Sequence, residues 1–235
     1  MRKLFNIKVD LDKKNLFDRI GQYTSKQEDH GIYDITIVGQ SLSGAFWLRE
    51  RIVVLNEINI YDSAEPIIFF KVSRCLFTLQ SISSKELILS IDSSSKSIKP
   101  FLKCLEQAIQ SKIFIDQIKI SLLELSKYIQ ASDNPLVKIT NSYSSNLTIS
   151  RHDKISFSIY SNENAILSAQ RIIKEVPLEF ERVKIESSQN GHPVTLDIKS
   201  NCLYNISLPN SNLEKTLIDF VIKKETDHQT HNTFD

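Results

Sequence analysis

The segment EPIIFFKVSRCLFTL, residues 65–79, organises this sequence because a diverged copy, HPVTLDIKSNCLYNI, follows at residues 192–206. The Pro, Ser, Cys and Leu positions recur at the same spacing, and an aromatic residue follows each Cys-Leu pair. Flanking segments match in the same order: residues 151–161 resemble 28–39, and residues 167–176 resemble 42–51. The sequence therefore predicts an internal tandem duplication.

Each copy is expected to be an α+β unit of one strand, one helix, an antiparallel meander and a second helix, with the helices on one sheet face. The expected bounds are 1–118 for the first repeat, 119–224 for the second and 225–235 for a flexible tail. Ser41 is expected to start a helix, and Ser211 with Glu214 is expected to form a capping box. Residues 112–130 suit a strand and then a helix, and their assignment is open.

Composition excludes several protein classes. Apolar residues make up 41% and charged residues 24% of the chain, as in soluble globular proteins. The net charge of +1 lacks the basic excess of dedicated nucleic-acid or membrane-surface proteins. The three cysteines form no CxxC pair, which argues against a disulfide framework or a four-ligand zinc site. With no apolar run of about 20 residues, the protein is expected to be soluble and cytoplasmic, with buried thiols.

Local catalytic motifs are largely missing. The chain has no GxGxxG, GxxxxGK[ST] or HExxH pattern, so no cofactor and no metal are expected. Ser41 lies in GQSLSG, but Ser43 stands where a nucleophile elbow needs its second glycine, so a helix N-cap is the ordinary interpretation. His30 and His152 match between the copies; one histidine per copy lacks further ligands, which favours two polar loop positions over a paired site.

One stretch of the second copy carries a candidate catalytic set. The two-residue period of a strand places Asp197 and Lys199 on one face. The order of a helix bearing Glu175, strands that include Glu186 and Asp197, and a final helix resembles the restriction-endonuclease core in element order. That resemblance implies carboxylates that hold Mg²⁺ and a lysine that positions the attacking water. A charged pair on the solvated face of an antiparallel strand is the commoner arrangement.

Aromatic residues of the first copy favour a binding function. Phe46, Trp47, Phe69 and Phe70 exceed what the matching positions of the second copy contain, and exposed aromatic patches anchor interfaces. The leading hypothesis is therefore a non-catalytic binding protein that contacts a protein partner or itself, as a subunit or adaptor of an intracellular complex. The alternatives are the nuclease and a nucleic-acid-binding protein, since the two copies resemble the saddle of the TATA-binding family in element order.

Overall fold

The computed structural model describes residues 1–23, 29–54, 66–92, 98–131, 137–148, 154–173 and 178–232. These residues form five helices and eleven strands, so the fold is α+β with a large, mainly antiparallel sheet. The chain divides into two compact units. Asn6–Ile115 is called the hairpin unit here, and Met1–Phe5 with Asp116–Asp235 is called the C-terminal unit.

The hairpin unit contains a sheet in the order β2-β3-β4-β5-β1. Its elements are β1 (Arg2–Val9), α1 (Lys13–Gln22), β2 (His30–Val38), β3 (Ser41–Val54), β4 (Ile67–Ser81), β5 (Glu86–Asp92) and α2 (Ile98–Ile109), and β6 (Ile113–Gln117) pairs with β1. Strand β1 passes from the C-terminal unit into this one at Asn6. Neighbours among β2, β3, β4 and β5 run antiparallel, as in a meander.

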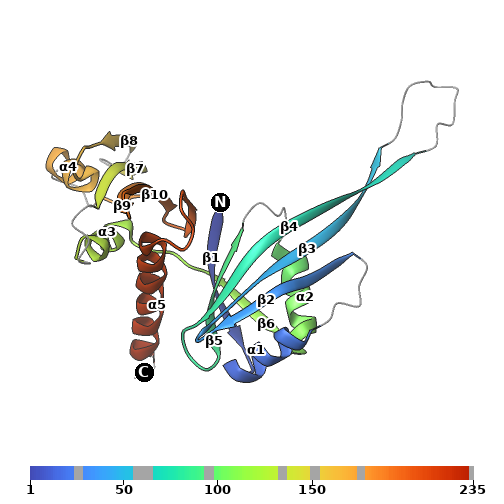
Figure 1. Ribbon diagram of the computed structural model, residues 1–235. Coiled ribbons are helices and arrows are strands. Elements are labelled where there is room, and N and C mark those ends of the chain that lie inside the picture. The colour runs from blue at the N-terminus through green and yellow to red at the C-terminus, as the bar shows by residue number, and fades with distance from the viewer. Residues whose placement is uncertain are drawn as a thin grey trace, which may run out of the picture. The chain divides into compact units, whose positions relative to one another are not determined.

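Helices α1 and α2 cover the base of this sheet (Figure 1). Leu16, Phe17 and Ile20 of α1 are buried, at the spacing of one face of a helix. Phe101 of α2 is fully buried and packs against Phe46 of β3 and Phe77 of β4, with ring centroids 5.5 and 4.9 Å apart. These three rings fix α2 against the centre of the sheet.

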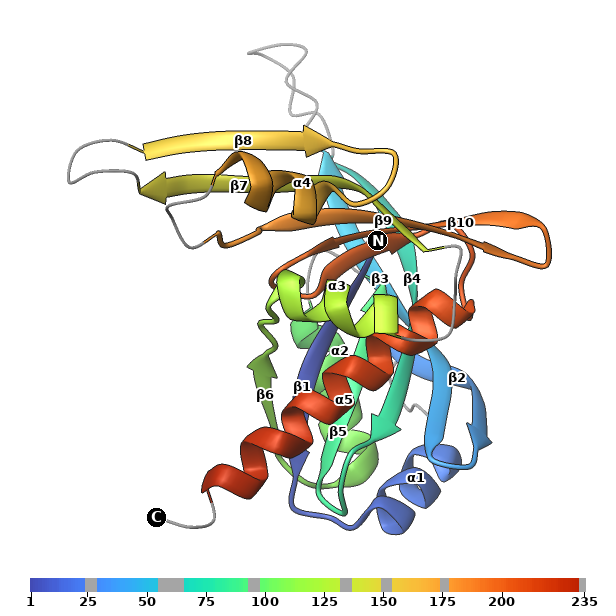
Figure 2. The same cartoon turned by 90° about the vertical axis from the view of Figure 1, so that its left-hand side faces the viewer.

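The C-terminal unit contains a sheet in the order β1-β11-β10-β9-β7-β8. Its elements are α3 (Leu122–Ala131), β7 (Lys138–Thr148), β8 (Lys154–Tyr160), α4 (Ala165–Ile172), β9 (Arg182–Gln189), β10 (His192–Lys199), β11 (Leu203–Ile206) and α5 (Asn212–Asn232). Helices α3 and α5 lie side by side, and α4 lies along β7 (Figure 2). The Ser142 hydroxyl donates to the carbonyl of Ala165 at 3.2 Å and so ties β7 to α4.

Glu214 organises the start of α5. The predicted capping box forms in part: the Glu214 amide donates to the Ser211 hydroxyl at 3.4 Å. The Glu214 carboxylate accepts instead from the amide of Asn210 at 2.7 Å, from Arg2 Nη1 at 2.8 Å and from the hydroxyl of Tyr204 at 2.8 Å. This buried carboxylate thus joins β1, β11 and α5, which explains why a charged side chain tolerates burial there.

The helix predicted to start at Ser41 is wrong. Residues 41–54 form β3, in which Ser41 pairs with Gln80 and caps no helix. Pairing with β4 places Leu42 and Phe46 on the buried face at the period of a strand, and this long-range contact overrides local helix propensity. Residues 67–81, which span IIFFKV and CLFTLQ, form one continuous strand, β4.

The tandem duplication is not confirmed. Segment 42–51 is a strand, whereas its match, 167–176, contains most of α4. Residues 112–130, whose assignment the sequence left open, contain the strand β6 and most of the helix α3. Helix α5 continues to Asn232, into the segment expected to be a tail. None of the helices in the described ranges has the length and apolar character needed to cross a bilayer.

Substitution of Gly44 by alanine should destabilise the hairpin unit. A Cβ atom there would lie 2.9 Å from Cζ of Phe77, whose ring is held against Phe101, so we expect a loss of about 1–3 kcal/mol in urea unfolding. Gly21→Ala is the matched control, because its Cβ would meet only Ile37 Cδ1 at 3.8 Å. Equal stability of the two variants would contradict this packing.

Candidate functional site

Part of the β3–β4 hairpin extends past the rest of the sheet. Its pairing runs from Ser41 with Gln80 to Val54 with Ile67. Strand β2 pairs with β3 only as far as Leu48, and β5 pairs with β4 only from Phe77 onward. Residues Arg49–Val54 and Ile67–Val72, called the distal hairpin here, therefore form a two-stranded ribbon that projects from the sheet (Figure 1).

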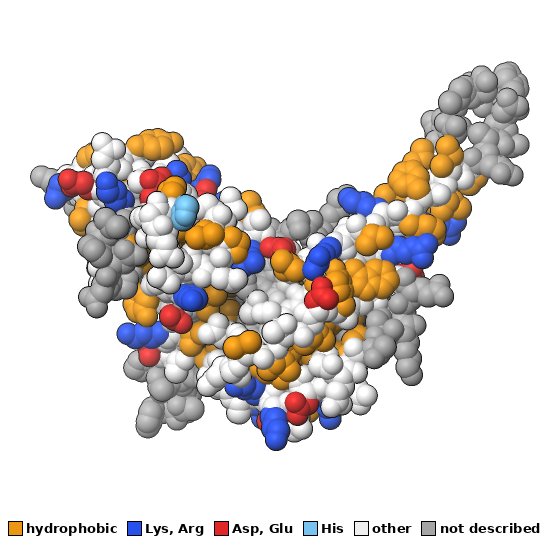
Figure 3. All heavy atoms as spheres, in the orientation of Figure 1, with side chains coloured by type: hydrophobic (Ala, Val, Ile, Leu, Met, Phe, Trp, Pro, Cys, Tyr) orange, Lys and Arg blue, Asp and Glu red, His pale blue; other side chains and the backbone are white. Residues whose placement is uncertain are grey.

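Apolar side chains cover both faces of the distal hairpin. The strand period places Ile68, Phe70 and Val72 on one face and Ile67 and Phe69 on the other. Phe69 is 46%, Phe70 50% and Val72 64% exposed. Ile67, Ile68 and, on β3, Val53 and Val54 are exposed as well, and hydrophobic side chains gather along this projection in Figure 3. These apolar side chains therefore remain exposed on both faces of the ribbon.

Cationic side chains lie among and beside these apolar residues. Arg49, Arg51 and Lys71 belong to the distal hairpin, against one acidic residue, Glu50. The Arg49 guanidinium stacks 3.8 Å from the ring centroid of Phe70, a cation–π contact that leaves both groups at the surface. The distal hairpin is therefore an apolar surface with a net positive charge.

The four predicted binding residues separate into three environments. Phe69 and Phe70 are exposed on the distal hairpin, whereas Trp47 is half-buried on β3. Phe46 is only 1% exposed and packs edge-on against Phe101, so it belongs to the core and not to an exposed aromatic surface. The correction follows from β3 being a strand, because the two-residue period turns neighbouring aromatic residues to opposite faces.

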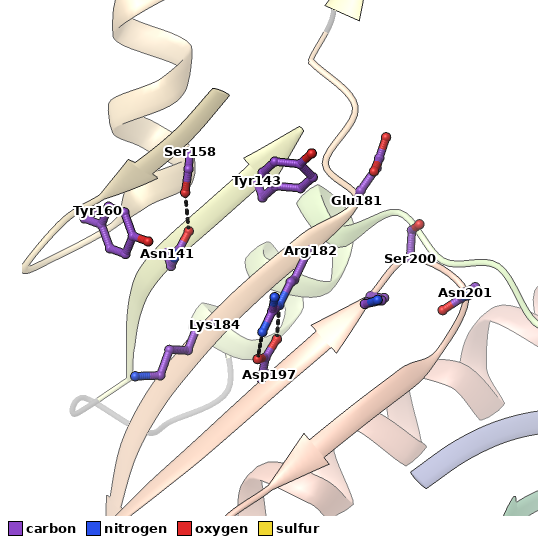
Figure 4. Close-up of a pocket in the computed structure, with 11 residues that line it drawn as sticks. Asn141, Tyr143, Ser158, Tyr160, Glu181, Arg182, Lys184, Asp197, Ser200 and Asn201 are labelled. Atoms are coloured by element: carbon purple, nitrogen blue, oxygen red, sulfur yellow. Dashed lines mark hydrogen bonds and ion pairs between the residues drawn. The ribbon is translucent and has the colours of Figure 1, made fainter. Parts of the chain in front are cut away.

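A second surface lies on the sheet of the C-terminal unit, on the face opposite to α4. It contains a depression of about 530 Å³. Most of the side chains that line it come from β7, β8, β9 and β10, and they include Tyr143, Tyr160, Arg182, Lys184 and Asp197 (Figure 4). Lys199 lines it as well. The register explains the clustering, because Arg182 lies opposite both Tyr143 and Lys199, and Lys184 lies opposite Asp197. This surface is called the polar face here.

Ion pairs hold the carboxylates of the polar face. Arg182 donates from Nε to Asp197 Oδ1 at 2.7 Å and from Nη2 to Oδ2, a bidentate pair that raises the pKa of the guanidinium. Lys184 lies 2.8 Å from Glu186 and, as its main hydrogen-bond partner, lowers the pKa of that carboxyl group. Asp197 and Glu186 are therefore each paired with a cation of the same face.

This geometry gives little support to the predicted nuclease site. Asp197 and Lys199 share a face as expected. Glu186 lies opposite Thr195, which is two residues before Asp197 on β10, so Glu186 is displaced along the strands from Asp197 and Lys199. Glu175 lies outside the described residues. In the parts of the chain that are described, no three His, Cys, Asp or Glu side chains gather as a metal site would require. The nuclease stays a prediction.

Arg182, Tyr143 and Tyr160 were missed by the sequence analysis. Tyr160 is 77% exposed at the end of edge strand β8, and Tyr143 is on the neighbouring strand β7. The alternation in KISFSIY was a usable signal for Tyr160. Tyr143 had no such signal, because it lies in the polar segment NSYSS, residues 141–145.

The remaining candidates are the three cysteines and the histidines His30 and His152. All three cysteines are buried, as predicted, and burial raises the pKa of Cys202 to about 12. Burial also raises the pKa of Cys104, so both thiols are neutral near pH 7. His30 starts β2, and His152 lies outside the described residues, so the structure does not bear on their pairing.

No protein-family model matches this sequence, and no curated protein is significantly similar to it. The distal hairpin and the polar face are therefore the features that bear on function. The two surfaces differ in chemistry: the first is apolar and cationic, and the second is polar with paired charges and two exposed tyrosines.

Proposed function

We propose that this chain is a non-catalytic binding protein that engages a protein partner through the distal hairpin, as a subunit or adaptor of a larger complex. The observation that carries the proposal is the apolar cluster exposed on both faces of the ribbon. Contiguous exposed apolar patches mark interaction sites. Covering the exposed half of a large side chain such as Phe70 is worth about 1 kcal/mol, so several such residues together support a stable interface.

The residue types also favour a protein partner. Aromatic residues and arginine are enriched at protein interfaces, where they act as anchors. Phe69, Phe70 and the stacked Arg49 provide this combination within one short ribbon. The cytoplasmic location expected from composition stays a prediction.

The double substitution Phe69→Ser with Phe70→Ser should abolish partner binding. Two aromatic anchors lost from one interface are expected to weaken it by at least about 2 kcal/mol, or roughly 30-fold. The tagged full-length chain and its variants would be isolated from native cells, and copurifying proteins would be quantified by mass spectrometry.

Phe114→Ser is the matched control, because Phe114 is 65% exposed on β6 and lies outside the distal hairpin. The control should retain every partner, and both variants should keep the parental melting temperature. An unchanged set of copurifying proteins with the double variant would contradict a binding role for this surface.

A second candidate function is single-stranded nucleic-acid binding at the polar face. The favouring observation is the pair Tyr143 and Tyr160, which lie diagonally across β7 and β8 on the face that also presents Lys184 and Lys199. Bases stack on exposed aromatic rings while cations meet the phosphates. The opposing observation is that Asp197 and Glu186 already neutralise two of the cations.

Combined substitution of Tyr160→Ala and Lys199→Ala would test this second function. If it is correct, fluorescence anisotropy should show binding of a labelled oligothymidine that falls steeply with added salt, and the variant should lose about 1–3 kcal/mol of affinity per stacked base. Phe114→Ala serves as the control. A chain that fails to bind the oligonucleotide even at low salt would exclude this function.

A further inference from the structure

Strand β4 has a long free edge in the distal hairpin. From Ile67 to Arg74 it pairs with β3 on one side, and no described strand pairs with the other side. The pairing with β5 starts at Phe77. Residues Ile67–Arg74, called the β4 edge here, therefore present outward-pointing backbone amides and carbonyls at every second position.

The free edge of β3 is shorter than that of β4. The amide of Arg49 donates to the carbonyl of Asp29 at 2.6 Å, so the free part of β3 begins after Arg49 and ends with the strand at Val54. A partner strand can therefore form more backbone hydrogen bonds with β4 than with β3.

The sequence of the β4 edge does little to prevent strand addition. Natural edge strands are protected by proline, bulges, short length or charged side chains, lysine especially. The β4 edge, IIFFKVSR, contains no proline, pairs with β3 without a register shift, and carries its two charges, Lys71 and Arg74, toward one end. Its other end is four consecutive apolar residues, 67–70, of high β-propensity. This edge is well suited to accept a strand.

The charges argue against a second copy of this chain as the occupant. The β4 edge contains two cations and no acidic residue. Arg74 pairs with Asp34 of β2 at 3.3 Å, and Glu50 lies opposite Lys71 between Arg49 and Arg51, so the net charge of this region stays positive. In an antiparallel pair of two β4 edges, the cationic end of each copy lies opposite the apolar end of the other, so no acidic side chain meets Lys71. An acidic strand of a different protein provides that opposite charge.

We propose that the β4 edge binds an extended strand of a partner protein, a proposal that rests on the function proposed above. Acidic residues of the partner strand lie beside Lys71–Arg74, and its apolar residues lie beside Ile67–Phe70. Main-chain hydrogen bonds give such a complex its affinity, and alternate side chains give its specificity. In antiparallel pairing the acidic half of the partner strand precedes its apolar half. The interface therefore selects a partner strand by both its composition and its direction.

A synthetic peptide would test this inference with the full-length chain. The probe is eight residues long, with glutamate at its first and fourth positions, threonine at its second and third, and valine and phenylalanine in its second half, so that one glutamate lies on the face of Arg74 and the other on the face of Lys71. Fluorescence anisotropy should show that it binds at least 10-fold more tightly than the same peptide with lysine for glutamate. The charge-reversed variant Lys71→Glu should invert this preference.

Two further measurements isolate the backbone contribution. Methylation of alternate peptide amides, on the edge that faces β4, should reduce affinity at least 10-fold, while methylation on the opposite edge should leave it unchanged. Hydrogen exchange should slow at the amides of Ile67–Arg74 when the unmodified peptide binds, and exchange in α2 should not change.

The outcomes separate this inference from the proposed function. Failure of both peptides to bind at millimolar concentration, equal affinity of the two peptides, or binding without slower exchange at the β4 edge would each overturn strand addition. The proposed function falls only if substitution of Phe69 and Phe70 leaves the copurifying proteins unchanged. The two proposals can therefore fail independently.

Discussion

The hairpin unit depends on the antiparallel backbone ladder between β3 and β4, which continues without a register shift from Ser41–Gln80 to Val54–Ile67. Its inner half belongs to a sheet that α1 and α2 cover, and there Phe46 and Phe77 hold α2 through Phe101. Among the described strands, only the backbone pairing between β3 and β4 holds its outer half. An isolated two-stranded hairpin is marginally stable in water, so the distal hairpin depends on being the continuation of a packed sheet.

The inner parts of β3 and β4 belong to the packed core, and their outer parts form the exposed distal hairpin. Apolar residues near α2 are buried and stabilise the fold, whereas apolar residues of similar type further along the strands are exposed. The difference is set by where β2, β5 and α2 end and not by the residue types, because phenylalanine occurs in both halves. An exposed apolar ribbon of this kind is costly in solution, and it becomes favourable when a partner covers it.

Local patterns in the sequence predicted much of the fold. The stripe of α1 and the strand at β1 follow from periodicity alone, but β3 does not, because its spacing also fits a helix and only pairing with β4 decides. For the polar face, the shared face of Asp197 and Lys199 was predictable, whereas Arg182 and Tyr143 are brought there by strand register. Similarity between segments 42–51 and 167–176 was misleading, because one is a strand and the other is mostly helix.

Excision of the distal hairpin tests the central claim most directly. Leu48 and Ser73 are paired across the ladder, so an Asn-Gly type I′ turn can join them in place of residues 49–72. The shortened chain should keep the parental melting temperature and lose the proteins that copurify with the intact chain. Unfolding of the shortened chain, or retention of those proteins, would contradict a distal hairpin that binds a partner without stabilising the fold.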